Sequence, residues 1–217
     1  MTNKKKALIA GIIGAVLLGA IILYLSYLGL SPDSDRVDEV EKQANQYMEE
    51  HFQQDYEIID TLYDNVDVYD TFSYAAIVEL ENDDRFKFLV FEHNETNELT
   101  DSYVAEHFEY ELESVLQPLL NEAYGEDNVQ ELWLTYPKDA GQQLNLDHTN
   151  VTSVTEHDLK PVIRITLDRG QEDDDEEKLD QIISEIQDEL NISGGHVTLS
   201  FNDSAIMFKD KDIKKEF

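Results

Sequence analysis

Histidine is the residue type in this sequence with the most accessible chemistry, because an imidazole can act as a general base or bind a metal near neutral pH. The chain has six histidines and no cysteine. Two of them, His148 and His157, lie in a turn-rich stretch with neighbouring carboxylates that include Asp158. Loops often carry functional residues, so we take His148, His157 and Asp158 as candidate metal ligands. The alternative is that they are ordinary surface residues of an acid-rich chain.

Motifs for catalysis or cofactor binding are absent from the sequence. His107 and Glu111 are spaced for one helix face, but the H-E-x-x-H pattern of zinc proteases does not occur. There is also no G-x-S-x-G elbow, phosphate-binding loop, G-x-G-x-x-G turn or EF-hand loop. We therefore predict no catalytic residue, no cofactor and a non-enzymatic role. The enzymatic alternative is a hydrolase or metal-dependent enzyme that uses His148, His157 and nearby carboxylates.

A run of acidic residues, 172–177, invites a metal-site interpretation. It directly precedes apolar residues at helical spacing, which begin at Leu179. Carboxylates in the first turn of a helix complement its dipole. We therefore predict that residues 172–177 begin a helix.

Apolar periodicity along the rest of the chain predicts an α+β fold of antiparallel sheets and helices. The expected helices cover residues 35–53, 101–124 and about 172–190, and the expected strands cover 56–63, 72–80, 85–92, 129–136, 161–167, 196–201 and 205–208. Pro118 should kink or split the second helix, because proline lacks the backbone donor.

The order of these elements predicts two subdomains, an α-β-β-β-α unit at 36–126 and a β-β-α-β-β unit at 127–209. Residues 210–217 are predicted to be a solvated tail. The alternative is that this lysine-rich end folds back on the acidic surface.

The composition is strongly acidic, with 48 Asp and Glu against 16 Lys and Arg and a net charge of −32. Such a field disfavours nucleic-acid binding, because phosphates are repelled. The chain is nevertheless 41% hydrophobic, which favours a folded core over a disordered tail. The acidic shell is typical of a salt- or alkali-adapted protein, and specific cation binding is the competing interpretation.

An uncharged stretch at residues 7–30 predicts a transmembrane helix, because it is longer than the apolar region of a cleavable signal. Lys4, Lys5 and Lys6 precede it, so residues 1–6 would be a cytoplasmic tip. Residues 31–35 would link the helix to a domain outside the cell. This interpretation predicts a single-pass protein of the cell membrane, with the lipid bilayer around residues 7–30.

Small residues recur within that stretch at Gly11, Ala15 and Gly19. A stripe of this kind lets two membrane helices approach closely, so a homodimer through the transmembrane helix is one interpretation. The other is that glycine and alanine are simply common in membrane helices.

The segments VEKQANQYMEEHF, YEIIDTLY and FKFLVFEH, together with the lysine-flanked N-terminal stretch, resemble the YfjL-like small membrane-anchored proteins of Gram-positive bacilli. The resemblance covers the anchor and about the first half of the remaining chain. It implies an α+β extracytoplasmic domain without an assigned chemistry. The α-β-β-β order is also similar to peptidase-regulating and cystatin-like modules in topology.

These observations favour a non-enzymatic, membrane-tethered interaction module of the cell envelope that binds a protein or peptide partner. An exposed strand edge could accept an extended segment of that partner. The alternatives are the hydrolase or metal-dependent enzyme described above and a passive structural protein of the envelope.

Overall fold

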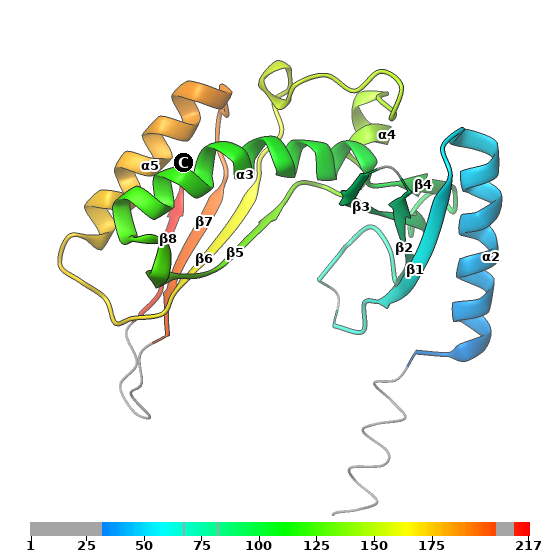
Figure 1. Ribbon diagram of the computed structural model, residues 1–217, viewed down its shortest axis with the longest axis horizontal. Coiled ribbons are helices and arrows are strands. Elements are labelled where there is room, and N and C mark those ends of the chain that lie inside the picture. The colour runs from blue at the N-terminus through cyan, green and yellow to red at the C-terminus, as the bar shows by residue number, and fades with distance from the viewer. Residues whose placement is uncertain (1–31, 67, 82, 203–210) are drawn as a thin grey trace, which may run out of the picture.

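The computed structural model describes residues 32–66, 68–81, 83–202 and 211–217. They form two four-stranded sheets and the helices that cover them (Figure 1). The first half contains α2 (Ser34–His51), β1 (Tyr56–Tyr63), β2 (Tyr74–Leu80), β3 (Asp83–Glu92), β4 (Leu99–Asp101) and α3 (Tyr103–Tyr124). The second half contains η1 (Glu126–Asn128), β5 (Val129–Thr135), α4 (Ala140–Leu144), η2 (Val154–Glu156), β6 (Val162–Leu167), α5 (Asp175–Leu190), β7 (His196–Phe201) and β8 (Ile213–Glu216).

The first sheet, sheet A, is antiparallel with the strand order β1-β2-β3-β4. Helix α2 covers one face of it, because Val40, Ala44 and Met48 recur every four residues and are buried. These side chains pack with apolar residues of β2 and β3 in one core cluster. The helix begins after Asp33, whose carboxylate accepts a hydrogen bond from the Asp35 backbone N–H.

The second sheet, sheet B, has the order β5-β6-β7-β8. Strands β6 and β7 are parallel and are connected through α5, so this sheet is mixed where the sequence predicted antiparallel pairing. Alternate residues of β6 and β7, such as Ile163, Ile165 and Leu199, are buried in the core that this sheet shares with α3 and α5.

Helix α3 is the longest described helix and joins the two halves of the molecule. Figure 1 shows it lying across the top of sheet B with its N-terminal end at sheet A. Its apolar residues recur at helical spacing, with Phe108, Leu112 and Leu116 almost fully buried. The sequence assigns this helix to the first subdomain, whereas the structure places its buried stripe in the core of the second half.

Two local expectations about α3 and the C-terminus can be compared with the structure. The helix continues through Pro118 as one element and ends at Gly125, whose φ of 88° favours glycine.

Residues 213–216 form β8 instead of a solvated tail. Lys215 of this strand makes ion pairs with Glu176 and Asp180 of α5, as the alternative reading of the C-terminus predicted. The strand expected at 205–208 lies outside the described residues.

The expected transmembrane helix and single-pass membrane location need correction. Within the described ranges 32–66, 68–81, 83–202 and 211–217, no helix is both long enough and apolar enough to span a bilayer. The described long helices bury one apolar stripe and carry acidic residues elsewhere, which is the pattern of helices packed on sheets. The fold class is therefore corrected to α+β with two sheets. Residues 7–30, with Lys4, Lys5, Lys6 and the stripe Gly11, Ala15 and Gly19, lie outside the described residues.

The central position of α3 predicts how the fold responds to a cavity. Phe108 is 0% exposed, and its replacement by alanine should lower the free energy of unfolding by about 3–5 kcal/mol, because the side chain fills the core between α3 and sheet B. Tyr110→Ala, two residues along at a side chain that is 50% exposed, should cost less than about 1 kcal/mol. Urea unfolding of both variants measures the difference, and equal losses would contradict this packing.

Candidate functional site

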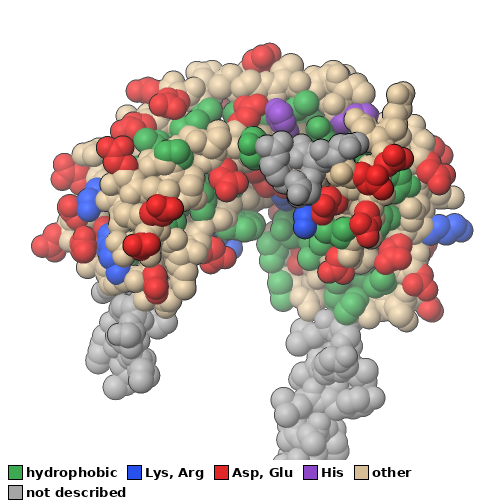
Figure 2. All heavy atoms as spheres, viewed as in Figure 1, with side chains coloured by type: hydrophobic (Ala, Val, Ile, Leu, Met, Phe, Trp, Pro, Cys, Tyr) green, Lys and Arg blue, Asp and Glu red, His purple; other side chains and the backbone are tan. Residues whose placement is uncertain are grey.

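A hollow on the described surface lies between the two sheets, beneath α3. Figure 2 shows this hollow, with hydrophobic side chains along its sheet A side. The hollow contains three cavities of about 420, 410 and 490 Å³, and Tyr69 lines all three. We call these three cavities together the intersheet cleft. Because they share lining residues, the three cavities adjoin one another.

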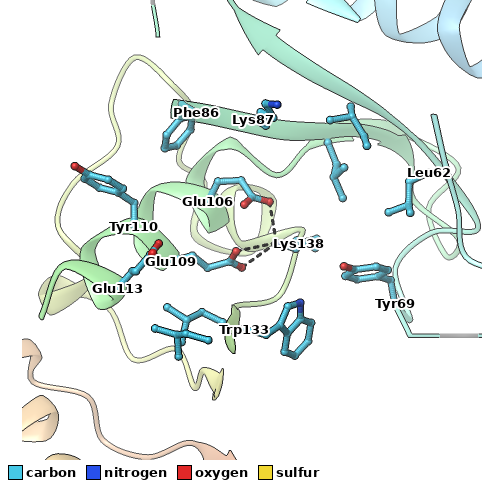
Figure 3. Close-up of a pocket in the computed structure, with 14 residues that line it drawn as sticks. Leu62, Tyr69, Phe86, Lys87, Glu106, Glu109, Tyr110, Glu113, Trp133 and Lys138 are labelled. Atoms are coloured by element: carbon cyan, nitrogen blue, oxygen red, sulfur yellow. Dashed lines mark hydrogen bonds and ion pairs between the residues drawn. The ribbon is translucent and has the colours of Figure 1, made fainter. Parts of the chain in front are cut away.

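The roof of the intersheet cleft carries a buried ion cluster made by Lys138, Glu106 and Glu109. Lys138 follows β5, and both glutamates project from α3 (Figure 3). The Lys138 Nζ donates to Glu106 Oε1 at 2.8 Å and to the two carboxylate oxygens of Glu109 at 2.9 and 3.0 Å. An ammonium group has three protons, so these contacts occupy its donors.

Burial and neighbouring charges strongly shift the pKa of Glu109. Desolvation, followed by repulsion from the Glu106 carboxylate, raises the pKa of Glu109 from 4.5 to about 8, although Lys138 opposes the shift. The two carboxylates in turn raise the pKa of Lys138 against the opposing effect of burial. Glu109 also accepts a hydrogen bond of 2.8 Å from the Tyr136 backbone N–H. The cluster therefore joins the end of β5 to the middle of α3.

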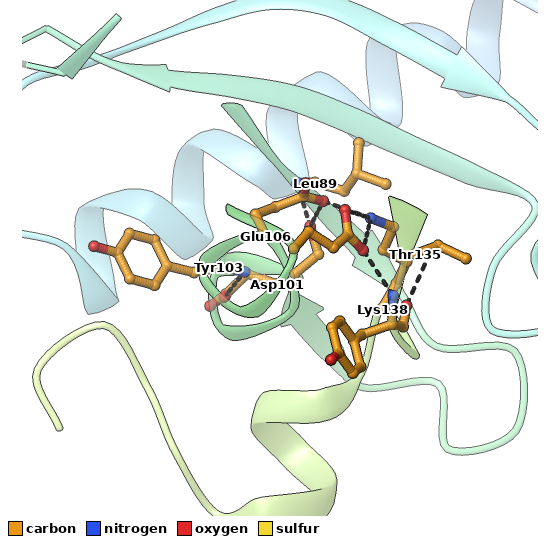
Figure 4. Close-up of polar contacts among 9 residues, drawn as sticks. Leu89, Asp101, Tyr103, Glu106, Thr135 and Lys138 are labelled. Atoms are coloured by element: carbon orange, nitrogen blue, oxygen red, sulfur yellow. Dashed lines mark hydrogen bonds and ion pairs between the residues drawn. The ribbon is translucent and has the colours of Figure 1, made fainter. Parts of the chain in front are cut away.

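The same cluster reaches sheet A through a serine at the start of α3. The Ser102 hydroxyl donates to Glu106 Oε1 at 3.0 Å and accepts from the Leu89 backbone N–H at 2.8 Å, within the polar contacts drawn in Figure 4. Ser102 is fully buried. A continuous chain of polar contacts therefore runs from Leu89 of β3 through Ser102 and Glu106 to Lys138, which lies shortly after β5.

A second buried polar pair lies next to this cluster in the chain. His93 Nε2 is 3.5 Å from Asp139 Oδ2, and both residues line the 410 Å³ cavity. The Glu95 backbone N–H donates to His93 Nδ1, which leaves the proton of a neutral ring on Nε2, facing the carboxylate. This pair connects the end of β3 to the start of α4.

One wall of the intersheet cleft is the face of sheet B that bears no helix. Trp133 of β5 and Arg164 of β6 are cross-strand partners there, and the guanidinium carbon lies 4.7 Å from the centre of the indole ring. Thr166, Thr198 and Ser200 line the same 490 Å³ cavity. This wall combines one cation, one large aromatic ring and several hydroxyl groups.

The opposite wall comes from sheet A and the loop between β1 and β2. Leu62, Ile77 and Leu89 line it from the sheet. In the loop, the Asp64 carboxylate accepts hydrogen bonds from the backbone N–H groups of Val68, at 3.0 Å, and Tyr69, at 2.6 Å. A short loop held from within by a carboxylate can present apolar side chains without a covering element.

The structure gives the two histidines that we selected different partners. The His148 ring stacks on Phe52 with centroids 4.1 Å apart. His157 Nε2 is 2.8 Å from the Thr152 hydroxyl oxygen, and Asp158 accepts a hydrogen bond from the Ser193 hydroxyl. None of the three lines the intersheet cleft. Metal binding by His148, His157 and Asp158 stays a prediction.

We predicted that the acidic run 172–177 begins a helix, and its second half does so, since α5 begins at Asp175 and residues 172–174 precede it. Asp175 is fully buried, and Arg169 donates to both of its carboxylate oxygens at 2.6 and 2.9 Å. Among the described residues, Glu172, Asp174 and Asp175 are the one group of three side chains spaced to share a metal ion. The two hydrogen bonds from Arg169 give the buried Asp175 carboxylate a structural role at the start of α5.

Sequence reasoning missed the residues of the intersheet cleft for identifiable reasons. Lys138 lies in a turn, and no sequence pattern indicates that two glutamates some thirty residues earlier surround it. Two signals were available on sheet B: Trp133 is the only tryptophan, and Arg164 interrupts an apolar strand at the spacing of an exposed face.

Comparison with known proteins adds little to this geometry. No protein-family model and no curated protein matches the chain. Among solved structures, the chain is similar to the crystal structure of a DUF5037 family protein from Ruminococcus gnavus ATCC 29149. The identity is 14%, the TM-score is 0.33, and the match covers 76% of this chain and 75% of that chain. A similarity this distant supports no functional argument, and the YfjL-like resemblance stays a prediction.

The raised pKa of Glu109 predicts a pH-dependent contribution to stability. In the unfolded chain this carboxyl should release its proton near its ordinary value, whereas in the folded protein it holds the proton to about pH 8. Its contribution to the free energy of unfolding is therefore fully present at low pH and is lost as pH rises from about 4.5 to about 8. Glu109→Gln should remove this part of the pH dependence.

Urea unfolding across that pH range measures the effect. Glu113→Gln is the matched control, because it makes the same substitution, and removes a carboxyl, at an exposed position one turn along α3. This control should keep the pH slope of the parent protein. Identical slopes for Glu109→Gln and the parent would contradict the assignment.

Proposed function

We propose that the protein is a non-enzymatic binding module that holds an extended segment of a protein or peptide partner in the intersheet cleft. The observation that carries this proposal is the run of three adjoining cavities around Tyr69, between an apolar wall and a polar wall. Adjoining cavities suit the alternating side chains of an extended peptide better than one compact ligand.

Two exposed valines on the loop wall support binding as the role of the cleft. Val66 is 67% exposed and Val68 is 52% exposed, and both line the 490 Å³ cavity. Branched apolar side chains this exposed gain free energy when a partner covers them. Because the Asp64 carboxylate holds the loop backbone, little ordering should be required on binding.

The state of the ionisable groups favours binding over catalysis. A raised pKa in a cleft is a usual indication of a catalytic acid or base. Here, however, Lys138 directs its three donors at Glu106 and Glu109, and Glu109 also accepts a backbone hydrogen bond. These groups are committed to the connection between α3 and the end of β5, which supports a structural role for them.

Removal of the exposed valines tests the proposal. Peptides selected from a random library on the full-length protein should alter the fluorescence of Trp133, the only tryptophan, because it lines the cleft. Val66→Ser combined with Val68→Ser should weaken their binding at least about tenfold, since two apolar contacts are lost. Fluorescence titration gives the dissociation constants.

Ile59→Ser is the matched control, because Ile59 is also an exposed apolar residue, at 39%, and lines none of the three cavities. This variant should bind like the parent protein. The proposal fails if the library yields no peptide that changes Trp133 fluorescence, or if the double serine variant binds as tightly as the control.

A further inference from the structure

The helix-free face of sheet B carries a row of four residues that cross the strands. Trp133 of β5 pairs with Arg164 of β6, Arg164 pairs with Thr198 of β7, and Thr198 pairs with Lys214 of β8. Cross-strand partners project to the same face of a sheet. The row therefore places two cations on one face of a chain whose net charge is −32.

Arg164 differs from the other arginines whose side chains the structure describes. Arg36 contacts the Glu39 carboxylate and Arg169 contacts the Asp175 carboxylate. Within the described part of the chain, Arg164 has no hydrogen bond or ion pair with a carboxylate, and its recorded contact is the face of Trp133. Carboxylates outnumber basic side chains threefold in this sequence, with 48 against 16, so an arginine without one is notable.

Three hydroxyl side chains line the same cavity as this guanidinium. Thr198 is its cross-strand partner, and Thr166 and Ser200 pair with each other one step along the same face. All three line the 490 Å³ cavity and are half-buried. The structure records no hydrogen bond from these hydroxyls to another described residue, so they can bond to a ligand.

The far wall of this cavity is apolar where the exposed Val66 and Val68 face it with Leu62. Asp64 also borders it, but its carboxylate already accepts backbone hydrogen bonds within the loop. One side of the cavity therefore offers a cation with hydroxyls, and the other offers branched aliphatic side chains. A matching ligand has an anionic group and an apolar group attached to the same small centre.

We infer that this cavity binds the C-terminal carboxylate of a peptide, with the apolar side chain of its last residue against Val66 and Val68. The inference rests on the proposed function and adds the part of the partner that is recognised. A guanidinium binds the two oxygens of a carboxylate through parallel hydrogen bonds. A terminal residue carries its carboxylate and side chain on one Cα, which matches the two walls.

The acidic charge of the protein favours a ligand with a single negative charge. The protein's net charge repels anions, and the repulsion grows with the ligand's charge. A singly charged carboxylate therefore suits one arginine better than a phosphate group of about two charges. Glu131, an exposed residue at the edge of the cavity, adds to this preference.

The test compares N-acetylated pentapeptides ending in Leu, Val or Phe, each prepared as the free acid and as the amide. Binding to the full-length protein is measured by Trp133 fluorescence and by calorimetry. The acids should bind about tenfold to a hundredfold more tightly than the amides, because only they form charge-assisted hydrogen bonds with Arg164. Arg164→Gln should reduce the acids to the affinity of the amides.

Arg36→Gln is the matched control, because Arg36 also lies over an aromatic ring, that of Tyr74, and lines none of the three cavities. It should keep the difference between acids and amides. Acids and amides that bind equally, with a change in Trp133 fluorescence, overturn the inference and leave the proposed function standing. If neither set binds while library peptides do, the inference alone fails, and if no peptide binds at all, both fail.

Discussion

The three-way contact of Lys138 with Glu106 and Glu109 is the interaction on which the relation of the two sheets depends. Its lysine side chain is 8% exposed, so the ammonium group is held away from water, and loss of Lys138 would leave Glu106 and Glu109 without their cation. Through Ser102, the same cluster is bonded to the Leu89 backbone in sheet A. The roof of the cleft is therefore held by directional polar contacts, while apolar packing holds each sheet to its own helices.

This division of roles explains why a recess persists between the sheets. Helix α2 covers one face of sheet A, helices α3 and α5 cover one face of sheet B, and the opposite faces border the cleft. If apolar side chains lined both of these faces, burial would favour closing the gap. On sheet B, however, the face carries Arg164, Thr198 and Ser200, which prefer water or a polar ligand. The cleft can therefore stay open without exposing a second hydrophobic core.

The acidic composition has a different physical consequence at the surface and in the cleft. Exposed carboxylates repel one another and are screened by salt, so they favour solubility more than any particular geometry. Within the cleft the few cations are placed individually, because Lys138 joins two glutamates and Arg164 lies on Trp133. The cleft therefore differs from the acidic surface because it holds individually placed basic side chains, Lys138 and Arg164.

Sequence periodicity alone determined much of the local structure. The stripe of Val40, Ala44 and Met48 predicted α2, and the acidic run before Leu179 predicted the start of α5, because both depend on residues close in the chain. The hydropathy of residues 7–30 likewise indicated only a local property, and the membrane-spanning fold inferred from it required correction.

Only the tertiary structure decided which distant residues meet. The parallel pairing of β6 with β7 places Arg164 beside Thr198, and α3 brings Glu106 and Glu109 to Lys138. Sequence spacing does not encode such contacts, because they depend on how the sheets and helices pack after each has formed. The sequence by itself therefore determined the helices, most of the strands and the charge of this protein, and packing decided the cleft and the side chains that line it.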